Sequence, residues 1–159
     1  MTTRFTLVTL RVLLLLGLAI AMAVQVIVLP VLSGWMAESY PEVAYMRWPV
    51  LTLTVLGLLF GEVVLVATWR LLDAIASSQI FASTSFAWVD GIIWSLAAAT
   101  AVSVALFGYL TWVGIGPITV PVLALLTVLA ALGMLLLMIV MRSLLQQASA
   151  LHTDMEAVI

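Results

Sequence analysis

Residues 49–69 read PVLTLTVLGLLFGEVVLVATW, and this stretch decides the fold. A helix that crosses the apolar core of a bilayer needs about 20 predominantly apolar residues, and this stretch meets that length with one ionisable residue as the exception. The exception is Glu62, which follows Gly61 and precedes Val63. An ionised, unpaired carboxylate at that depth costs several kcal/mol, so Glu62 is a functional-site candidate by default.

Three further segments have the same character, at about 12–32, 91–113 and 118–141. The whole chain is 66% hydrophobic and 8% charged, whereas soluble globular domains are about 45–50% apolar. The short connection at 114–117 requires the last two spans to be antiparallel neighbours. We therefore predict an all-α protein, a single four-helix transmembrane bundle over residues 1–159, with a cytoplasmic helical tail at 142–159 that extends the fourth span.

The arginines predict the orientation of the chain. One set of span ends carries Arg4, Arg11, Arg70 and Arg142, whereas the segment between the first two spans has only Arg47. By the positive-inside rule, both termini and the middle loop are expected in the cytoplasm. A cleaved secretory signal is the alternative for the first segment, although its apolar run continues to Leu32, beyond the usual length of such signals.

The segment at 33–48 is expected at the outer surface of the membrane. It carries four aromatic rings, a pattern typical of anchors at headgroup depth, with a ligand cage as the alternative: Trp35, Tyr40, Tyr45 and Trp48. Ser39, Pro41 and Glu42 fit a capping box with Ser39 as N-cap. They predict a short interfacial helix from about Tyr40 to Met46.

Gly57 and Gly61 form a GxxxG pattern in the second span. Glycines at this spacing allow two helix backbones to approach closely inside a membrane. We predict that both lie at a helix contact, either within the chain or with a second copy of it. Glu62 is about 100° around the helix from Gly61, so its side chain is expected to point inward rather than at lipid.

Depth arithmetic at about 1.5 Å per residue predicts the surroundings of Glu62. It is expected level with small residues of the other spans: Ala19, Ser95 to Ala99 and Gly133. Gln25, the other strongly polar residue inside a span, is expected higher, so a direct hydrogen bond to Glu62 needs helix tilt or a water. Three interpretations stay open: a protonated Glu62 that donates to a backbone carbonyl or Ser95, a ligand or proton site lined with Gln25, and a contact between subunits.

Two expected cytoplasmic elements carry a family resemblance. The first comprises WRLLD at 69–73, IFAS at 80–83 and FAWVDGII at 86–93, and the second comprises MRSLLQQA at 141–148 with DMEAVI at 154–159. Over about 62–159 the chain resembles the bacterial four-span family called domain of unknown function 2975. The resemblance implies a bacterial inner-membrane protein with no assigned activity. Genes of this family often accompany a small helix-turn-helix regulator, which makes such a regulator a candidate partner.

The middle loop departs from the family element at Ala87, where an arginine is expected, and this argues against a loop salt bridge to Asp90. Its residues predict a helical extension of the second span to about Ala76 and a third helix capped by Ser83 or Ser85. Three aromatic residues are expected at the inner interface, as anchors or as a docking surface for a partner: Phe81, Phe86 and Trp88.

The tail has a heptad pattern that begins inside the fourth span. Apolar residues recur at alternating spacings of four and three: Leu137, Met141, Leu144, Ala148, Leu151, Met155 and Val158. This is the a/d seam of a coiled coil. The seam is expected to pack on the chain's own middle loop, to pair with a second copy, or to receive a helix of a cytoplasmic partner.

Catalytic constellations are nearly absent from the sequence. There is no cysteine, and His152 with Glu156 supplies only two of the ligands that a metal site needs. No phosphate-binding loop occurs, and the net charge of -2 provides no basic patch for direct nucleic-acid binding. We expect no enzyme, metal or cofactor. Three functions remain: a regulatory protein that binds a cytoplasmic partner, a small transport or lipophile-binding bundle, and a structural subunit of a membrane complex.

Overall fold

The computed structural model describes residues 2–76, 83–114 and 118–156, with side chains for 5–73, 87–114 and 118–148. In chain order the elements are α1 (Thr2–Ala23), the π-helix η1 (Val24–Val28), α2 (Leu29–Ser39), the 3₁₀-helix η2 (Pro41–Met46), α3 (Arg47–Ala76), α4 (Ser83–Val113) and α5 (Thr119–Glu156). Four helical segments are long and apolar enough to cross a membrane: Phe5–Ser39, Pro41–Asp73, Ala87–Val113 and Thr119–Ala148. The prediction of an all-α protein with four spans is confirmed.

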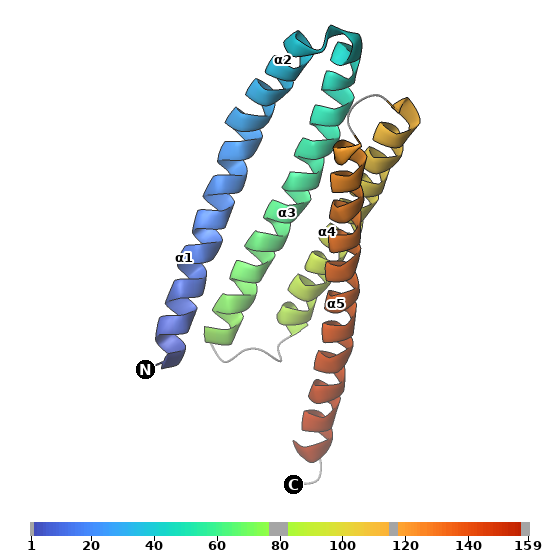
Figure 1. The fold of residues 1–159 in the computed structure, drawn as a ribbon. Coiled ribbons are helices and arrows are strands. Elements are labelled where there is room, and N and C mark those ends of the chain that lie inside the picture. The colour runs from blue at the N-terminus through green and yellow to red at the C-terminus, as the bar shows by residue number, and fades with distance from the viewer. Residues whose placement is uncertain (1, 77–82, 115–117, 157–159) are drawn as a thin grey trace.

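The four long segments pack in chain order. The most extensive contact joins α3 to α4, the next joins α4 to α5, and a smaller one joins α1 to α3. Figure 1 shows this arrangement, with the two marked ends of the chain at the same end of the molecule. The lower part of α5 extends beyond the ends of the other helices. We call the end that carries Arg11, Arg70 and Arg142 the arginine-rich end.

The first span contains a wide turn directly before Pro30. The Leu29 N–H donates to the Val24 carbonyl, five residues back, instead of the usual four. Proline lacks an N–H, and its ring collides with the carbonyl four residues back in a regular helix. The wider turn relieves that collision, so the helix continues from α1 through η1 into α2 rather than ending at the proline.

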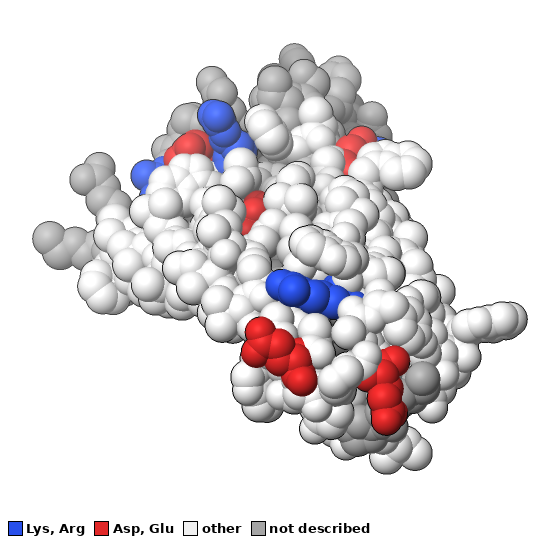
Figure 2. Space-filling model, turned by 90° about the horizontal axis from the view of Figure 1, so that it is seen from above, with Lys and Arg blue, Asp and Glu red and all other residues white. Residues whose placement is uncertain are grey.

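The connection between the first two spans contains a short helix where one was predicted, because η2 covers Pro41–Met46. The prediction that Ser39 caps it is wrong. The Tyr40 N–H donates to the Met36 carbonyl at 2.9 Å, so α2 still includes Ser39, and η2 begins after Tyr40 without a side-chain cap. The view from above, over this end of the molecule, shows small groups of charged residues on a largely uncharged surface (Figure 2).

The predicted extension of the second span also agrees with the structure, since α3 ends at Ala76. The centre of the packing lies between α3 and α4. Ala67, Ile92 and Leu96 form its buried cluster, with exposed fractions of 2%, 3% and 9%. The close approach at Ala67 depends on a small side chain, which is how helices associate where lipid removes the hydrophobic drive between them.

Helix α4 ends with a glycine in the left-handed conformation. Gly114 has φ +62°, and its N–H donates to the Leu110 carbonyl at 3.2 Å. This is the αL arrangement that commonly satisfies a carbonyl at a helix C-terminus. The predicted turn at 114–117 therefore begins at Gly114, and its remaining residues lie outside the described ones.

Gly114→Ala should destabilise the protein by about 1 kcal/mol, because alanine adopts this backbone conformation only with strain. Gly108→Ala is the matched control. It lies inside α4, where an added Cβ meets no atom within 4 Å, so the higher helix propensity of alanine should stabilise the protein slightly. Thermal unfolding in detergent, followed by circular dichroism, should give shifts of opposite sign. Equal shifts for both variants would contradict the assignment of the cap.

Candidate functional site

Glu62 is buried on the face of α3 that is directed at α1, with an exposed fraction of 8%. It lies three residues before Leu65 and seven before Trp69, which places all three on one helical face. Both of the other residues meet α1. A Cβ placed on Gly17 would lie 3.9 Å from Leu65 Cδ1, and the Arg11 guanidinium lies 5.9 Å from the centre of the Trp69 ring.

The antiparallel packing of α1 on α3 fixes the level of Glu62 along the first span. Counting three residues back from Leu65 and three forward from Gly17 brings Glu62 level with Ile20, next to Ala19 and Ala21. The Glu62 Oε1 atom is buried and accepts no hydrogen bond from the described residues. The carboxyl group therefore lies in an apolar interface with one oxygen unpartnered by that part of the chain.

The predicted polar partners of Glu62 do not bond to it. Ser95 is buried in α4, with 8% exposed, but no hydrogen bond among the described side chains joins it to Glu62. Gln25 lies in η1, and its Oε1 is likewise buried without a donor from the described residues. Both oxygens are therefore buried without a hydrogen-bond donor from the described residues, and they lie on α3 and on the first span without a direct bond between the two side chains.

The two glycines of the GxxxG pattern differ in their surroundings. A Cβ placed on Gly57 would lie 3.7 Å from Val102 Cγ1, so Gly57 is at the contact with α4. Gly61 is exposed, and a Cβ placed on it would meet no atom within 4 Å. The contact with α4 therefore includes Gly57, whereas Gly61 lies on an open surface of α3.

At the arginine-rich end, each pair of adjacent helices is joined by an arginine. Arg11 of α1 forms an ion pair with Asp73 of α3. Arg70 of α3 lies over the Trp88 ring of α4, 5.7 Å from its centre. The third interaction joins α4 to α5: Arg142 Nη2 donates to Asp90 Oδ2 at 3.0 Å.

The last of these interactions gives Asp90 a partner that sequence reasoning missed. Position 87 holds alanine rather than an arginine, but the guanidinium of Arg142, from α5, binds the Asp90 carboxylate instead. Arg142 Nε also lies against Asp90 Oδ1, so the pair has two points of contact. The sequence did contain a signal for this pair. Asp90 directly precedes the third predicted span and Arg142 directly follows the fourth, and antiparallel packing of these spans brings the two residues to the same end.

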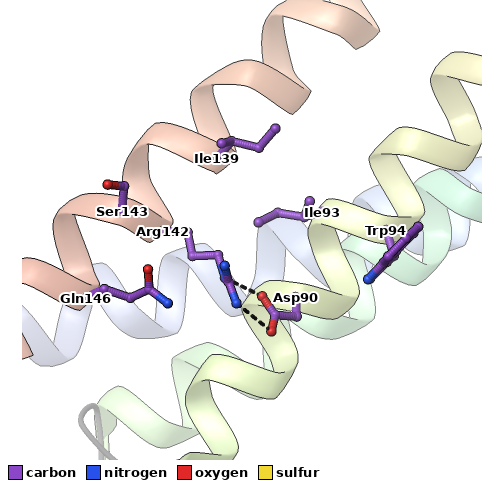
Figure 3. Close-up of a pocket in the computed structure, with 7 residues that line it drawn as sticks. All are labelled: Asp90, Ile93, Trp94, Ile139, Arg142, Ser143 and Gln146. Atoms are coloured by element: carbon purple, nitrogen blue, oxygen red, sulfur yellow. Dashed lines mark hydrogen bonds and ion pairs between the residues drawn. The ribbon is translucent and has the colours of Figure 1, made fainter.

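An open groove of about 330 Å³ lies beside this ion pair, between α4 and α5 (Figure 3). Its polar lining consists of Asp90, Arg142, Ser143 and Gln146, and its apolar lining consists of Ile93, Trp94 and Ile139. Trp94 is 77% exposed. The groove therefore combines a cation, an anion and neutral polar groups with an apolar flank.

The predicted docking residues fall into two groups. Trp88 is 40% exposed, Leu144 is 53% exposed, and Ala148 is also exposed. The other candidates lie outside the residues whose side chains the structure describes: Phe81, Phe86, Leu151, Met155 and Val158. The first group consists of accessible apolar side chains at the arginine-rich end.

Comparison with known families gives one family match. The family model described as Protein of unknown function (DUF2975) matches residues 31–159, which extends the resemblance seen in the sequence to the connection between the first two spans and to all of α3. No curated protein and no solved structure matches the chain. The function must therefore be argued from the geometry of the chain itself.

Proposed function

Since the chain belongs to the family described as Protein of unknown function (DUF2975), whose description states no activity, we propose its function from its own geometry. We propose that it is a non-enzymatic protein of a bacterial cytoplasmic membrane, and that it acts by binding a helix of a cytoplasmic partner along α5. Its termini lie in the cytoplasm in this proposal, because Arg4, Arg11, Arg70 and Arg142 are at one end and only Arg47 is at the other.

The observation that carries this proposal is the exposed apolar stripe on α5. Its members with described side chains are all exposed: Leu137 (61%), Met141 (53%), Leu144 (53%) and Ala148. Lipid covers the first two in a membrane, but Leu144 and Ala148 lie beyond Arg142. Over the side chains that the structure describes, the stripe leaves the membrane without packing on its own chain, and such a stripe is a surface for another helix.

The packing of α5 on α4 explains why the stripe stays free. Leu135 and Met138 pack against the α3–α4 cluster, and Arg142 continues the same face through its bond to Asp90. The stripe residue Leu137 directly precedes Met138, and Met141 directly precedes Arg142. One position corresponds to about 100° around the helix. The stripe therefore faces sideways from the contact with α4.

The projection of α5 is long enough for a helical partner. The helix continues from Arg142 to Glu156, which is about 20 Å at the rise of an α-helix. Figure 1 shows this part beyond the ends of α1, α3 and α4. The helix-turn-helix regulator that the family resemblance implies is a partner of suitable chemistry, because such domains are built of amphipathic helices.

Deleting residues 144–159 should abolish binding of the candidate helix-turn-helix regulator. The full-length membrane protein, purified in detergent and immobilised, would be titrated with the purified regulator by biolayer interferometry. Leu144→Glu should weaken binding about tenfold or more, because it places a charge in an apolar helix contact. Gln146→Glu is the matched control, since it adds the same charge on the other flank of α5 and should bind like the wild type.

Two results would contradict the proposal. Equal binding by the full-length and deleted proteins would remove α5 from the function. Loss of binding in both glutamate variants would show that binding does not depend on the apolar stripe in particular. A wild-type protein that migrates as a dimer, and becomes a monomer with Leu144→Glu, would assign the stripe to a second copy of the chain. Size-exclusion chromatography with light scattering measures that outcome on the same samples.

One observation favours a second candidate function, which is binding of a small hydrogen-bond donor between α1 and α3. The Glu62 Oε1 atom is buried and has no donor among the described residues, and the Gln25 Oε1 atom shares that condition. A transport or lipophile-binding role would use this interface. The thermal stability of Glu62 variants separates this candidate from a purely structural carboxyl.

A further inference from the structure

We propose that the groove between α4 and α5 binds the headgroup of a phospholipid that carries both a phosphate and a primary ammonium group, as phosphatidylethanolamine does. The groove holds one positive and one negative side chain close together, Arg142 and Asp90. A zwitterionic headgroup has the complementary pair of charges. This site lies apart from the apolar stripe and does not depend on the proposed function.

The ion pair has unused hydrogen-bonding capacity on its open side. A guanidinium has five N–H donors and a carboxylate has about four acceptor positions, whereas the pair has one hydrogen bond, from Nη2 to Oδ2, and one further ion contact, between Nε and Oδ1. The two side chains are 37% and 41% exposed, so a ligand reaches both. The phosphate would accept from Arg142, and the ammonium would donate to Asp90, which are charge-assisted hydrogen bonds.

The groove is apolar at the end toward the middle of the spans and polar at the end toward the helical tail, which matches the change in polarity from the core of a bilayer to its surface. Ile93 follows Asp90 by one turn, and Ile139 precedes Arg142 by one turn, so both lie toward the apolar part of the spans. Ser143 and Gln146 lie on the opposite side, toward the helical tail. A lipid with its headgroup at the ion pair would place the start of its acyl chains against the isoleucines.

Trp94 and the size of the groove support the same ligand class. Figure 3 shows Trp94 on α4, one turn from Asp90, and its side chain is 77% exposed. Exposed indoles at the ends of spans are typical of the membrane–water interface. The volume of about 330 Å³ is at the lower end for ligand pockets, which suits one headgroup rather than a large ligand.

The groove and the apolar stripe lie on opposite flanks of α5. Ile139 follows Met138 by one residue, whereas Leu137 precedes it by one, so the two are about 200° apart around the helix. Lipid binding and partner binding can therefore be removed independently. Leu144→Glu should leave the lipid preference unchanged.

The experiment is native mass spectrometry of the full-length protein in detergent with an equimolar mixture of three lipids. Phosphatidylethanolamine, phosphatidylcholine and phosphatidylglycerol with identical acyl chains would compete for the protein. We expect about a tenfold preference for the first, because the choline headgroup offers no N–H to Asp90 and the glycerol headgroup has no cation. Soluble glycerophosphoethanolamine should compete poorly, since it lacks the chains that contact Ile93 and Ile139.

The double variant Asp90→Asn/Arg142→Gln should lose this preference. Arg11→Gln/Asp73→Asn is the matched control, because it removes another ion pair at the same end and should keep the preference. Trp94→Ala changes an exposed side chain, so it should fold normally and bind the lipid several-fold more weakly. Equal retention of the three lipids by the wild type, or an unchanged preference in the Asp90/Arg142 variant, would overturn the proposal.

Discussion

Glu62→Met should raise the thermal unfolding temperature of the purified protein in detergent by about 3–6 °C. Glu62 is 8% exposed, and its Oε1 has no donor among the described residues. A buried polar group without a partner costs about 1–3 kcal/mol, and methionine fills a similar space without that penalty. For a chain of this size, 1 kcal/mol corresponds to about 2–4 °C.

Two controls give this result its meaning. Val63→Met changes the next residue, which is 49% exposed, and should leave the unfolding temperature nearly unchanged. Glu62→Gln keeps a polar group in the interface and should give little or no gain. If Glu62→Met instead lowers the unfolding temperature, the carboxyl has a stabilising partner in the purified protein, and the ligand site between α1 and α3 becomes the better interpretation.

Ala67→Phe should have the largest destabilising effect in the chain. Ala67 is 2% exposed and packs with Ile92 and Leu96 at the centre of the α3–α4 contact. A phenyl ring in that position forces the helices apart or forces neighbouring side chains out of their preferred rotamers, at a cost of about 1–3 kcal/mol or more. We expect the unfolding temperature to fall by about 5 °C or more.

The matched control is Val66→Phe, since Val66 is 45% exposed and lines an open hollow between α1 and α3, away from the contact with α4, where a ring has room. A second measurement reports the helix separation directly. The chain has no cysteine, so Gly57→Cys/Val102→Cys supplies a single cysteine pair across the contact. A Cβ placed on Gly57 would lie 3.7 Å from Val102 Cγ1. Disulfide formation should be efficient in that background and slow when Ala67→Phe is added. Unchanged cross-linking and stability would contradict the packing described for Ala67.

The spans and their extensions could be predicted because they depend on local properties of the sequence. Hydropathy marks four apolar segments, and the end of α3 at Ala76 follows from the helix-favouring run after Arg70. Exceptions arise where two local signals compete. The capping pattern at Ser39 is overridden because α2 continues to the residue before Tyr40, and Pro30 is accommodated by a π-helix that the sequence pattern does not reveal.

The candidate sites were harder to predict because they depend on which helix faces which. The burial of Glu62 was predicted, but its position on the α1 side of α3 was not. A GxxxG pattern indicates a helix contact but does not indicate which helix makes it. Gly57 meets α4, whereas Glu62 shares its face with Leu65 and Trp69. The Arg142–Asp90 pair joins residues from different helices, and only the antiparallel register brings them together.

The chain-order packing determines how a force would travel through the protein. A displacement of the projecting end of α5 reaches α4 first, then α3, and α1 last, because the main contacts follow that sequence. Polar interactions on this route include those of Arg142 with Asp90, Arg70 with Trp88, and Arg11 with Asp73. Mechanical strain from a partner that pulls on the tail would thus end at the α1–α3 interface, where Glu62 is buried.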